Sequence, residues 1–308
     1  MQGMSHIDPT NTARAAGTVA LVGPGAIGTT VAAALHEAGR ALRLCGRTAR
    51  DRLELRRAGG RVIVPGPVRT DPAQVGGPVD LVLLGVKATQ LEAASSWLAA
   101  LCGPRTIVCV LQNGVEQQAM LAPYIAGDRV VPAVVWFPAE TQPDGSVLLR
   151  GDARLTLPDS PASRVVADTL RGTWCDVELA TDFTSVAWRK LLQNAAAGLM
   201  VLARRRSGMF HRDDIAELAL RYLRECLTVA RAEGAHLDDG VPGEILARFQ
   251  SFPQDMGTSI LSDRDAGRPL EWDTRNGVVR RLGRVHGIPT PISDVIVPLL
   301  AASSDGPG

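Results

Sequence analysis

The chain has almost no net charge and no long apolar run. Lys and Arg total 33 and Asp and Glu total 32, which leaves a formal net charge of +1 at pH 7. So close a balance gives no long-range field that would attract nucleic acid or an anionic membrane. The most apolar stretch is bracketed by Lys190 and by arginines 204–206, so it falls short of a transmembrane helix, which needs about 18 uncharged apolar residues. We therefore expect a small-molecule partner, with no nucleic acid and no membrane.

Cysteine and histidine are scarce and scattered. The five cysteines lie far apart without a CxxC pair, and none of the five histidines stands at a telling distance from an acid or another ligand. This spacing indicates neither a disulfide framework nor a metal site, and it fits a reducing compartment. The polar residues 1–16 lack the apolar core of a signal peptide and are predicted to form a flexible tail. Together these absences predict a cytoplasmic protein without a bound metal.

From residue 18 onward, short apolar runs alternate with helix-sized stretches. The runs cover residues 18–22, 41–45, 80–86, 106–112 and 129–136, and the helical stretches cover 27–38, 89–101 and 114–122. Runs that are apolar throughout are typical of parallel strands covered by helices on both faces. Strand and helix in repeated alternation predict an α/β fold with a doubly wound, Rossmann-type parallel sheet.

The pattern changes twice further along the chain. Residues 138–157 carry turn chemistry around Pro143-Asp144-Gly145, which is typical of a β-hairpin. After residue 182 the strand signals cease, and helical patterns cover residues 183–206, 213–233, 242–264 and 270–286. A chain of 308 residues is long enough for two domains that each bury their own core. We expect a Rossmann domain over residues 17–181 and an all-helical domain over residues 182–308.

A glycine-rich turn joins the first predicted strand to the first predicted helix. It reads Gly23-Pro24-Gly25-Ala26-Ile27-Gly28. In a dinucleotide site the first glycine permits the tight turn, the second lets the backbone approach the pyrophosphate, and the third lets helix and strand pack closely. The helix N-terminus then offers unpaired N–H groups to the phosphates. Such glycines can also be purely structural, but the strand–turn–helix context favours a nucleotide site.

The second predicted strand ends without an acid. An NAD site places a carboxylate there to bind the ribose 2′-hydroxyl, whereas this chain has Arg47 two residues after Cys45. A guanidinium at that point would pair with a 2′-phosphate, with Arg50 as a second candidate. The alternative is that Arg47 is an ordinary exposed loop cation. The charge favours NADPH over NADH.

Four motifs occur in a fixed order along the chain. They are GPGAIG (23–28), QNG (112–114), WRKLLQN (188–194) and TSILSDRDAGRPLEWDTRNG (258–277). Through these motifs the chain resembles the ketopantoate reductase (2-dehydropantoate 2-reductase) family, whose members share the two-domain plan of 6-phosphogluconate-dehydrogenase-like enzymes. The resemblance implies NADP as cofactor, hydride transfer to a 2-oxo acid in the cleft between the domains, and a place in pantothenate biosynthesis. By analogy it also makes a homodimer an expectation, although no residue pattern indicates one.

Lys190 matches the family's catalytic lysine. Hydride attack on a ketone builds negative charge on its oxygen, so a nearby ammonium can polarise the carbonyl and then donate a proton. A lone helical lysine is usually solvated, but Asn194 lies four residues on, on the same helix face. The resemblance implies that Glu271 is a second active-site residue. A carboxylate beside Lys190 would keep the ammonium charged and oriented, while the alternative for Glu271 is a carboxylate that favours a helix dipole.

The resemblance further implies Asn113, Asn194 and Ser259 as substrate-binding residues. It also places Asn113, Glu271 and Lys87 in contact with the cofactor. Each has a plainer alternative: Asn113 begins an Asn-Gly turn, Asn194 is a helix amide, and Lys87 is a loop cation. For Asn113, a turn and a ligand contact are compatible, because ligands gather at the carboxyl ends of parallel strands.

The chain departs from the family pattern at three places. Gly198 stands where the family has a second substrate-binding asparagine, and Met256 stands where a polar residue is frequent. Arginines 204–206 replace a further asparagine-bearing stretch, and they are either a carboxylate anchor or a solvated helix end. These changes leave two alternatives to a ketopantoate reductase: a related reductase of another small oxo acid, and an NADPH-binding protein that has lost catalysis.

Overall fold

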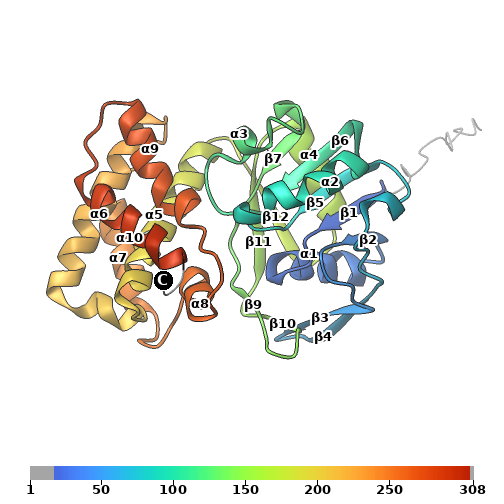
Figure 1. Cartoon of the computed structure of the whole chain (residues 1–308), viewed down its shortest axis with the longest axis horizontal. Helices are drawn as coiled ribbons and strands as arrows, with labels where there is room; N and C mark the ends of the chain where they lie inside the picture. Colours follow the sequence, from blue (N-terminus) through green and yellow to red (C-terminus); the bar gives the residue numbers. More distant parts are fainter. Residues whose placement is uncertain (1–16, 306–308) are drawn as a thin grey trace, which may run out of the picture.

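The computed structural model describes residues 17–305, which form two lobes side by side (Figure 1). The first lobe contains all the strands of the described chain, the last of which ends at Ala180, and the second lobe is helical from Phe183 onward. The predicted tail over residues 1–16 and the final residues 306–308 of the predicted helical domain lie outside the described residues.

The first lobe is built on a five-stranded parallel sheet in the order β2-β1-β5-β6-β7. The strands are β1 (Val19–Val22), β2 (Leu42–Cys45), β5 (Val79–Leu84), β6 (Cys102–Val110) and β7 (Val130–Pro132). Leu21 belongs to the same core cluster as α1 (Ala26–Glu37), whereas its neighbour Ala20 belongs to the cluster of α2 (Leu91–Leu101). Helices therefore cover both faces of the sheet, and the predicted doubly wound fold is confirmed.

Two smaller sheets complete the first lobe. One has the order β4-β3-β10-β9 and the other β12-β11-β8. Their strands are β3 (Arg52–Arg57), β4 (Gly60–Pro65), β8 (Val134–Val135), β9 (Ala139–Thr141), β10 (Val147–Leu149), β11 (Ala153–Pro158) and β12 (Cys175–Ala180). The predicted hairpin is the antiparallel pair β9–β10. The predicted single strand over residues 129–136 is wrong, because the chain breaks at Ala133 and its two halves join different sheets.

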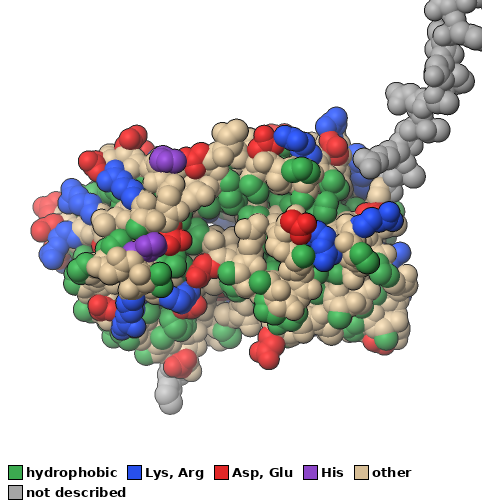
Figure 2. Space-filling model, turned by 90° about the horizontal axis from the view of Figure 1, so that it is seen from above, with side chains coloured by type: hydrophobic (Ala, Val, Ile, Leu, Met, Phe, Trp, Pro, Cys, Tyr) green, Lys and Arg blue, Asp and Glu red, His purple; other side chains and the backbone are tan. Residues whose placement is uncertain are grey.

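Short helices connect these strands. They are η1 (Pro72–Gln74), η2 (Ala88–Gln90), α3 (Gln117–Leu121), η3 (Gly127–Arg129) and α4 (Pro161–Leu170). The antiparallel pair β3–β4 was not predicted, because every second residue of β3 faces outward and interrupts the apolar run. In the described chain, charges of both signs are interspersed on the face that Figure 2 shows.

The second lobe surrounds the long helix α5 (Phe183–Ala203). The other elements are η4 (Ser207–His211), α6 (Asp213–Ala232), α7 (Val241–Ser251), α8 (Ser259–Asp265), the π-turn η5 (Asp273–Gly277), α9 (Val278–Val285) and α10 (Pro291–Ser304). The predicted helix over residues 242–264 is two helices, because the segment after Ser251 contains Pro253 and Gly257. Helix α10 was not predicted.

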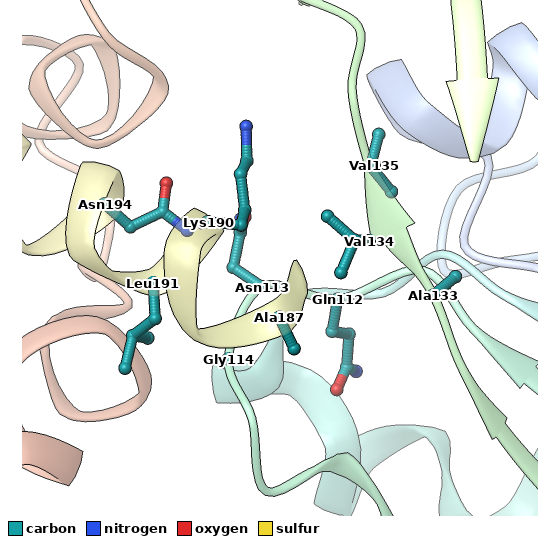
Figure 3. A pocket seen from close by; sticks show the side chains of 10 residues that line it. All are labelled: Gln112, Asn113, Gly114, Ala133, Val134, Val135, Ala187, Lys190, Leu191 and Asn194. Carbon is teal, nitrogen blue, oxygen red and sulfur yellow. Dashed lines mark hydrogen bonds between the residues drawn. The ribbon is translucent and has the colours of Figure 1, made fainter. Parts of the chain in front are cut away.

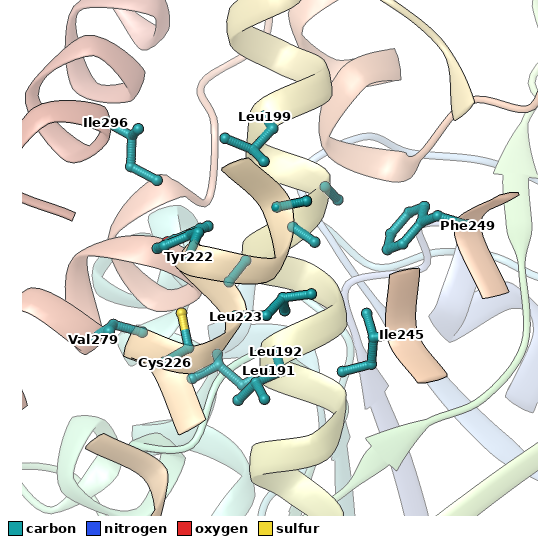
Figure 4. Close-up of a cluster of buried hydrophobic side chains, with 14 of the residues drawn as sticks. Leu191, Leu192, Leu199, Tyr222, Leu223, Cys226, Ile245, Phe249, Val279 and Ile296 are labelled. Atoms are coloured by element: carbon teal, nitrogen blue, oxygen red, sulfur yellow. The ribbon is translucent and has the colours of Figure 1, made fainter. Parts of the chain in front are cut away.

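Helix α5 is buried along most of its length. Leu191, Leu192 and Leu199 pack against Tyr222 and Leu223 of α6 in one continuous core (Figure 4). A polar side chain on such a buried helix needs a hydrogen-bond partner of its own. Asn194 is one of these buried polar side chains. Between residues 17 and 305, none of the helices is both long enough and apolar enough to cross a lipid bilayer.

Candidate active site

The glycine turn is tightly packed at its first and third glycines and open at its second. Gly23 has a φ of +91°, and a Cβ there would lie 2.7 Å from the backbone nitrogen of Val86. A Cβ on Gly28 would lie 2.4 Å from the carbonyl oxygen of Gly23. A Cβ on Gly25 would meet nothing within 4 Å. Since the first turn of α1 carries no acid, the open space beside Gly25 at the helix N-terminus suits a phosphate group.

Arg47 lies next to this turn. The residue before it, Gly46, is buried, and a Cβ there would lie 2.8 Å from the Cδ of Pro24. Arg47 itself is exposed at the end of β2, on the side where an adenosine ribose lies in dinucleotide-binding sheets. The neighbouring Arg50 donates from Nη1 to the carbonyl oxygen of Gly145 at 3.5 Å. These residues fit NADP, because the exposed Arg47 directly follows Gly46, which packs against Pro24 of the glycine turn.

The structure brings predicted residues of both lobes into one hydrogen-bonded network. Asn194 of α5 donates from Nδ2 to Oδ1 of Asn113 at 3.2 Å. Asn113, which follows β6, donates from its own Nδ2 to Oε2 of Glu271 at 3.3 Å. The other carboxylate oxygen of Glu271 accepts from the backbone N–H of Ala88 at 3.2 Å. The network therefore joins the carboxyl edge of the parallel sheet to the helical lobe.

Arg275 extends this network and was not predicted. Its Nη2 donates to Oε2 of Glu271 at 3.2 Å and to Oγ of Ser259 at 3.1 Å. The side chains of Arg275 and Glu271 are only 3% and 5% exposed, so this is a buried ion pair. Nothing in the sequence separates Arg275 from the many exposed arginines, because its burial depends on the π-turn and on the packing of both lobes.

Lys190 projects from α5 into a pocket between the lobes (Figure 3). Asn113, Asn194 and the β8 residues Val134 and Val135 line the same pocket. The Nζ of Lys190 lies 5.0 Å from the ring centre of Trp136, an aromatic residue that the sequence did not single out. Within residues 17–305 the ammonium forms no ion pair.

The pKa of Lys190 is lowered from 10.5 to about 8. Burial is the main cause, since it disfavours the charged amine, and the positive charges of Arg275 and Arg248 lower the pKa further. A lysine in this state gives up its proton more readily than a solvated lysine, as a general acid must.

The expectation that Glu271 would lie beside Lys190 as its counter-ion is wrong. The carboxylate pairs with Arg275, which lies four residues along the chain, and it also accepts from Asn113 and from the backbone of Ala88. Among residues 17–305 no carboxylate pairs with Lys190, and this is consistent with the lowered pKa of its amine.

Lys87 lies at the junction of the lobes. Its Nζ is 2.5 Å from Oδ2 of Asp263 in α8, and the other oxygen of Asp263 accepts from Nε of Arg268 at 2.9 Å. Lysine occurs in the chain at positions 87 and 190 alone, against 31 arginines. Both lysines thus lie at the cleft, and their scarcity is a sequence signal that points to the site.

The structure accounts for Gly198, one of the three departures from the family pattern. A Cβ on Gly198 would lie 2.7 Å from Nδ2 of Asn276, which donates to the carbonyl of Ala195 and to the hydroxyl of Tyr222, both at 3.0 Å. The buried Asn276 amide fills the space that a side chain at position 198 would need. The backbone carbonyl of Met256 accepts from the backbone N–H of Ser207 at 3.0 Å, and nothing in the structure explains the methionine side chain at this position. Arginines 204–206 are exposed, which favours a solvated helix end.

A Rossmann lobe with an open glycine turn, facing a helical lobe that carries a perturbed lysine, defines the class of two-domain nicotinamide-dependent oxidoreductases. Residues 19–162 match the family described as ketopantoate reductase PanE/ApbA, and residues 182–304 match the C-terminal domain of the same family. The chain belongs to the ketopantoate reductase family, and the prediction of an NADP-dependent oxidoreductase of this family is confirmed.

Individual relatives agree with the family match. A 2-dehydropantoate 2-reductase of Mycobacterium tuberculosis is 60% identical over 291 residues, which cover 94% of this chain and 99% of that protein. One of Caulobacter vibrioides is 37% identical over 288 residues, covering 93% and 99%. A dimeric ketopantoate reductase from Staphylococcus aureus superposes with a TM-score of 0.85 at 27% identity, covering 94% of this chain and 100% of that one.

Proposed function

We propose that this protein reduces 2-dehydropantoate to pantoate with NADPH, and that Lys190 is the proton donor. The observation that carries the proposal is the half-buried Lys190 amine, with a pKa lowered to about 8, in a pocket shared with Asn113 and Asn194. The 2-dehydropantoate 2-reductases to which the chain is 60% and 37% identical support this substrate.

The role proposed for Lys190 follows from the negative charge that develops on the substrate during reduction. NADPH supplies the hydride when it is bound. As the carbonyl oxygen of the substrate gains negative charge, the ammonium stabilises it and then transfers a proton to it. The apolar pocket walls, Val134, Val135 and Ala187, exclude water and strengthen this interaction.

Glu271 acts by fixing the direction of the amides. A carboxylate only accepts hydrogen bonds, so the Nδ2 of Asn113 must face Glu271 and its Oδ1 must face Asn194. Asn194 then donates an N–H to Asn113. In the described part of the chain its own Oδ1 accepts no hydrogen bond, so it can accept one from a substrate hydroxyl. The proposed role of Glu271 is therefore to orient the substrate-binding asparagines from the helical side of the cleft.

The cofactor is proposed to bind along the carboxyl edge of the parallel sheet. The turn Gly23 to Gly28 would hold the pyrophosphate at the N-terminus of α1, and Arg47 would pair with the 2′-phosphate. Lys87 lies on the same edge of the sheet and remains a proposed cofactor contact. The proposed boundary between residues 181 and 182 places the cofactor on one domain and Lys190 on the other.

The test is NADPH oxidation with 2-dehydropantoate and with a panel of other branched 2-oxo acids. The highest kcat/KM for 2-dehydropantoate, with a loss of about 100-fold or more in kcat for Lys190→Ala, is the expected result. A clear preference for another oxo acid would favour the related-reductase alternative. Tight NADPH binding without turnover of any oxo acid would favour the non-catalytic one.

We further propose a homodimer formed through the helical lobe in the cytoplasm. Val295 and Leu299 lie four residues apart on α10 and are 60% and 52% exposed, which is unusual for a pair of large apolar side chains on one helix face. The Staphylococcus aureus relative is described as dimeric. All five cysteines are free, as suits a reducing compartment.

A further inference from the structure

Three consecutive polar residues of the π-turn, Thr274, Arg275 and Asn276, are buried. Buried polar groups need partners, and a buried guanidinium needs them most because it also carries a charge. The amide nitrogen of Asn276 has two acceptors, Ala195 and Tyr222. Within residues 17–305 the Oδ1 of Asn276 and the Nε of Arg275 are both buried without a partner, and of these two side chains only the guanidinium carries a charge.

The donors of Arg275 are only partly used. A guanidinium carries five N–H groups, on Nε, Nη1 and Nη2. Nη2 donates to Ser259 and Glu271. Within residues 17–305 the buried Nε has no hydrogen-bond partner, and Nη1 forms no hydrogen bond. The site therefore holds N–H donors that still lack an acceptor, and a ligand with acceptor oxygens would complete it.

The charges of the site also call for an anion. The carboxylate of Glu271 balances one of the two cations, Arg275 and Lys190, and leaves an excess of one positive charge. Arg275 is close enough to Lys190 to lower the pKa of its amine. A 2-oxo acid carries one carboxylate, bonded directly to the keto carbon, so a cation that binds this carboxylate must lie close to the group that protonates the keto oxygen.

Ser259 is set up as a second donor. A serine hydroxyl has one proton to donate and two lone pairs to accept with. Its Oγ already accepts from Arg275, which occupies a lone pair and leaves the proton available. A carboxylate bound by the guanidinium can take this proton as a further hydrogen bond.

We propose that Arg275 binds the carboxylate of the 2-oxo acid substrate, with the hydroxyl of Ser259 as the second donor. The proposal rests on the 2-oxo acid reductase function and adds a substrate-binding residue to it. Hydrogen bonds between guanidinium and carboxylate are short, charge-assisted and often bidentate. Gly198 offers no side-chain donor, and arginines 204–206 are exposed, so a buried guanidinium takes over an anchoring role that these positions do not supply.

The test compares kcat/KM for 2-dehydropantoate with kcat/KM for its neutral amide. The wild type should prefer the acid. In Arg275→Met the ratio of acid to amide should fall about 10- to 100-fold, because the acid loses a charged hydrogen-bond partner and the amide does not. Arg275→Lys should fall in between, since an ammonium keeps the charge but lacks the fork of donors.

Arg248→Met is the matched control. Arg248 also lowers the pKa of Lys190, but it lies exposed on α7 and outside the network. This variant should keep the wild-type ratio of acid to amide. If Arg248→Met lowered the ratio as much as Arg275→Met does, the loss of any nearby positive charge would explain the effect. The proposal that Arg275 binds the carboxylate would then be overturned.

A second variant covers the case in which Arg275→Met fails to fold. Glu271→Gln combined with Arg275→Met removes both charges, so no unpaired carboxylate is left in the interior. Its acid-to-amide ratio should fall as in Arg275→Met, whatever happens to kcat. A ratio unchanged from wild type in either variant contradicts the carboxylate role. A wild type that turns over neither compound contradicts the proposed function instead.

Discussion

The Nζ of Lys190 lies 5.0 Å from the ring centre of Trp136, in a pocket that provides no carboxylate to balance its charge. The indole Nε1 donates to Thr156 at 2.9 Å, so the ring is held in place from the sheet side. The amine is therefore placed between an aromatic wall and the amides of the cleft. Its lowered pKa follows from burial and from nearby cations, and it makes the protonation of Lys190 sensitive to pH in the working range.

The first prediction concerns the pH dependence of the two directions of the reaction. Reduction needs the protonated amine, so its kcat/KM should fall as the pH rises through about 8. Oxidation of the hydroxy acid needs the neutral amine, so its kcat/KM should rise over the same interval. Lys190→Arg keeps the charge but not the titration, and should lose about 100-fold or more in kcat and show neither change. Identical pH profiles for both directions would contradict this assignment.

The second prediction separates binding from folding within the glycine turn. Gly25→Ala should melt like the wild type, because the new methyl group meets nothing within 4 Å. It should bind NADPH about 10- to 100-fold more weakly, since it stands where a phosphate approaches the backbone. Gly28→Ala should instead lower the melting temperature, because its Cβ would lie 2.4 Å from a carbonyl oxygen. Calorimetry and NADPH titration measure both quantities, and full NADPH affinity in Gly25→Ala would exclude this turn as the phosphate site.

The third prediction concerns the choice between NADPH and NADH. Arg47→Ala should weaken NADPH binding about 10- to 100-fold and leave NADH binding unchanged, because only NADPH carries the 2′-phosphate. Arg52→Ala, an exposed arginine five residues along, is the control and should change neither affinity. Titration of both cofactors against each variant gives the answer. An unaltered preference in Arg47→Ala would mean that another cation reads the phosphate.

The fourth prediction tests why position 198 is a glycine. Gly198→Ala should lower the free energy of unfolding by about 1–3 kcal/mol, because its Cβ would lie 2.7 Å from the amide of Asn276. Gly243→Ala is the control: it is exposed in α7 with open space around the new methyl, and should be neutral or more stable by up to about 1 kcal/mol. Urea unfolding measures both, and equal effects of the two substitutions would show that Asn276 does not fill this space.

The fifth prediction concerns assembly. The wild type should have about twice the mass of the 32.6 kDa chain in light scattering, and a double Val295→Glu, Leu299→Glu variant should be monomeric, because charges would replace the apolar face of α10. Val165→Glu, an exposed apolar residue on α4 of the other lobe, should leave the mass unchanged. Dimers that persist in the double variant would place the interface elsewhere.

The central sheet can be predicted from the sequence because burial on both faces leaves an apolar run, as in β1 and in residues 81–84 of β5. The same criterion overlooks β3, where outward-facing residues such as Arg52 alternate with buried leucines. It also overlooks α10, whose interior contains Pro298, and it runs α7 and α8 together across Pro253. These elements have an exposed face and no clear apolar pattern, so they are recognised only when their partners are known.

Some residues of the candidate site could also be predicted from the sequence, and others could not. Lys190, Asn113 and Asn194 could be named from the sequence because they stand in motifs that resemble those of the family. The partner of Glu271 could not be predicted, because the buried pair with Arg275 is created by a π-turn and by packing between the lobes. An arginine followed by Asn-Gly has no sequence feature that distinguishes a buried guanidinium from a solvated one.

The scarcity of lysine allows the central claim to be measured directly. Protein labelled with 13C at the lysine ε-carbons should show two lysine signals, and the loss of one in Lys87→Arg assigns them. The Lys190 signal is predicted to titrate with a pKa of about 8 and to parallel the loss of reductase activity on the alkaline side. A Lys190 signal that titrates near 10.5, as in a solvated lysine, would contradict the account of this residue as the proton donor.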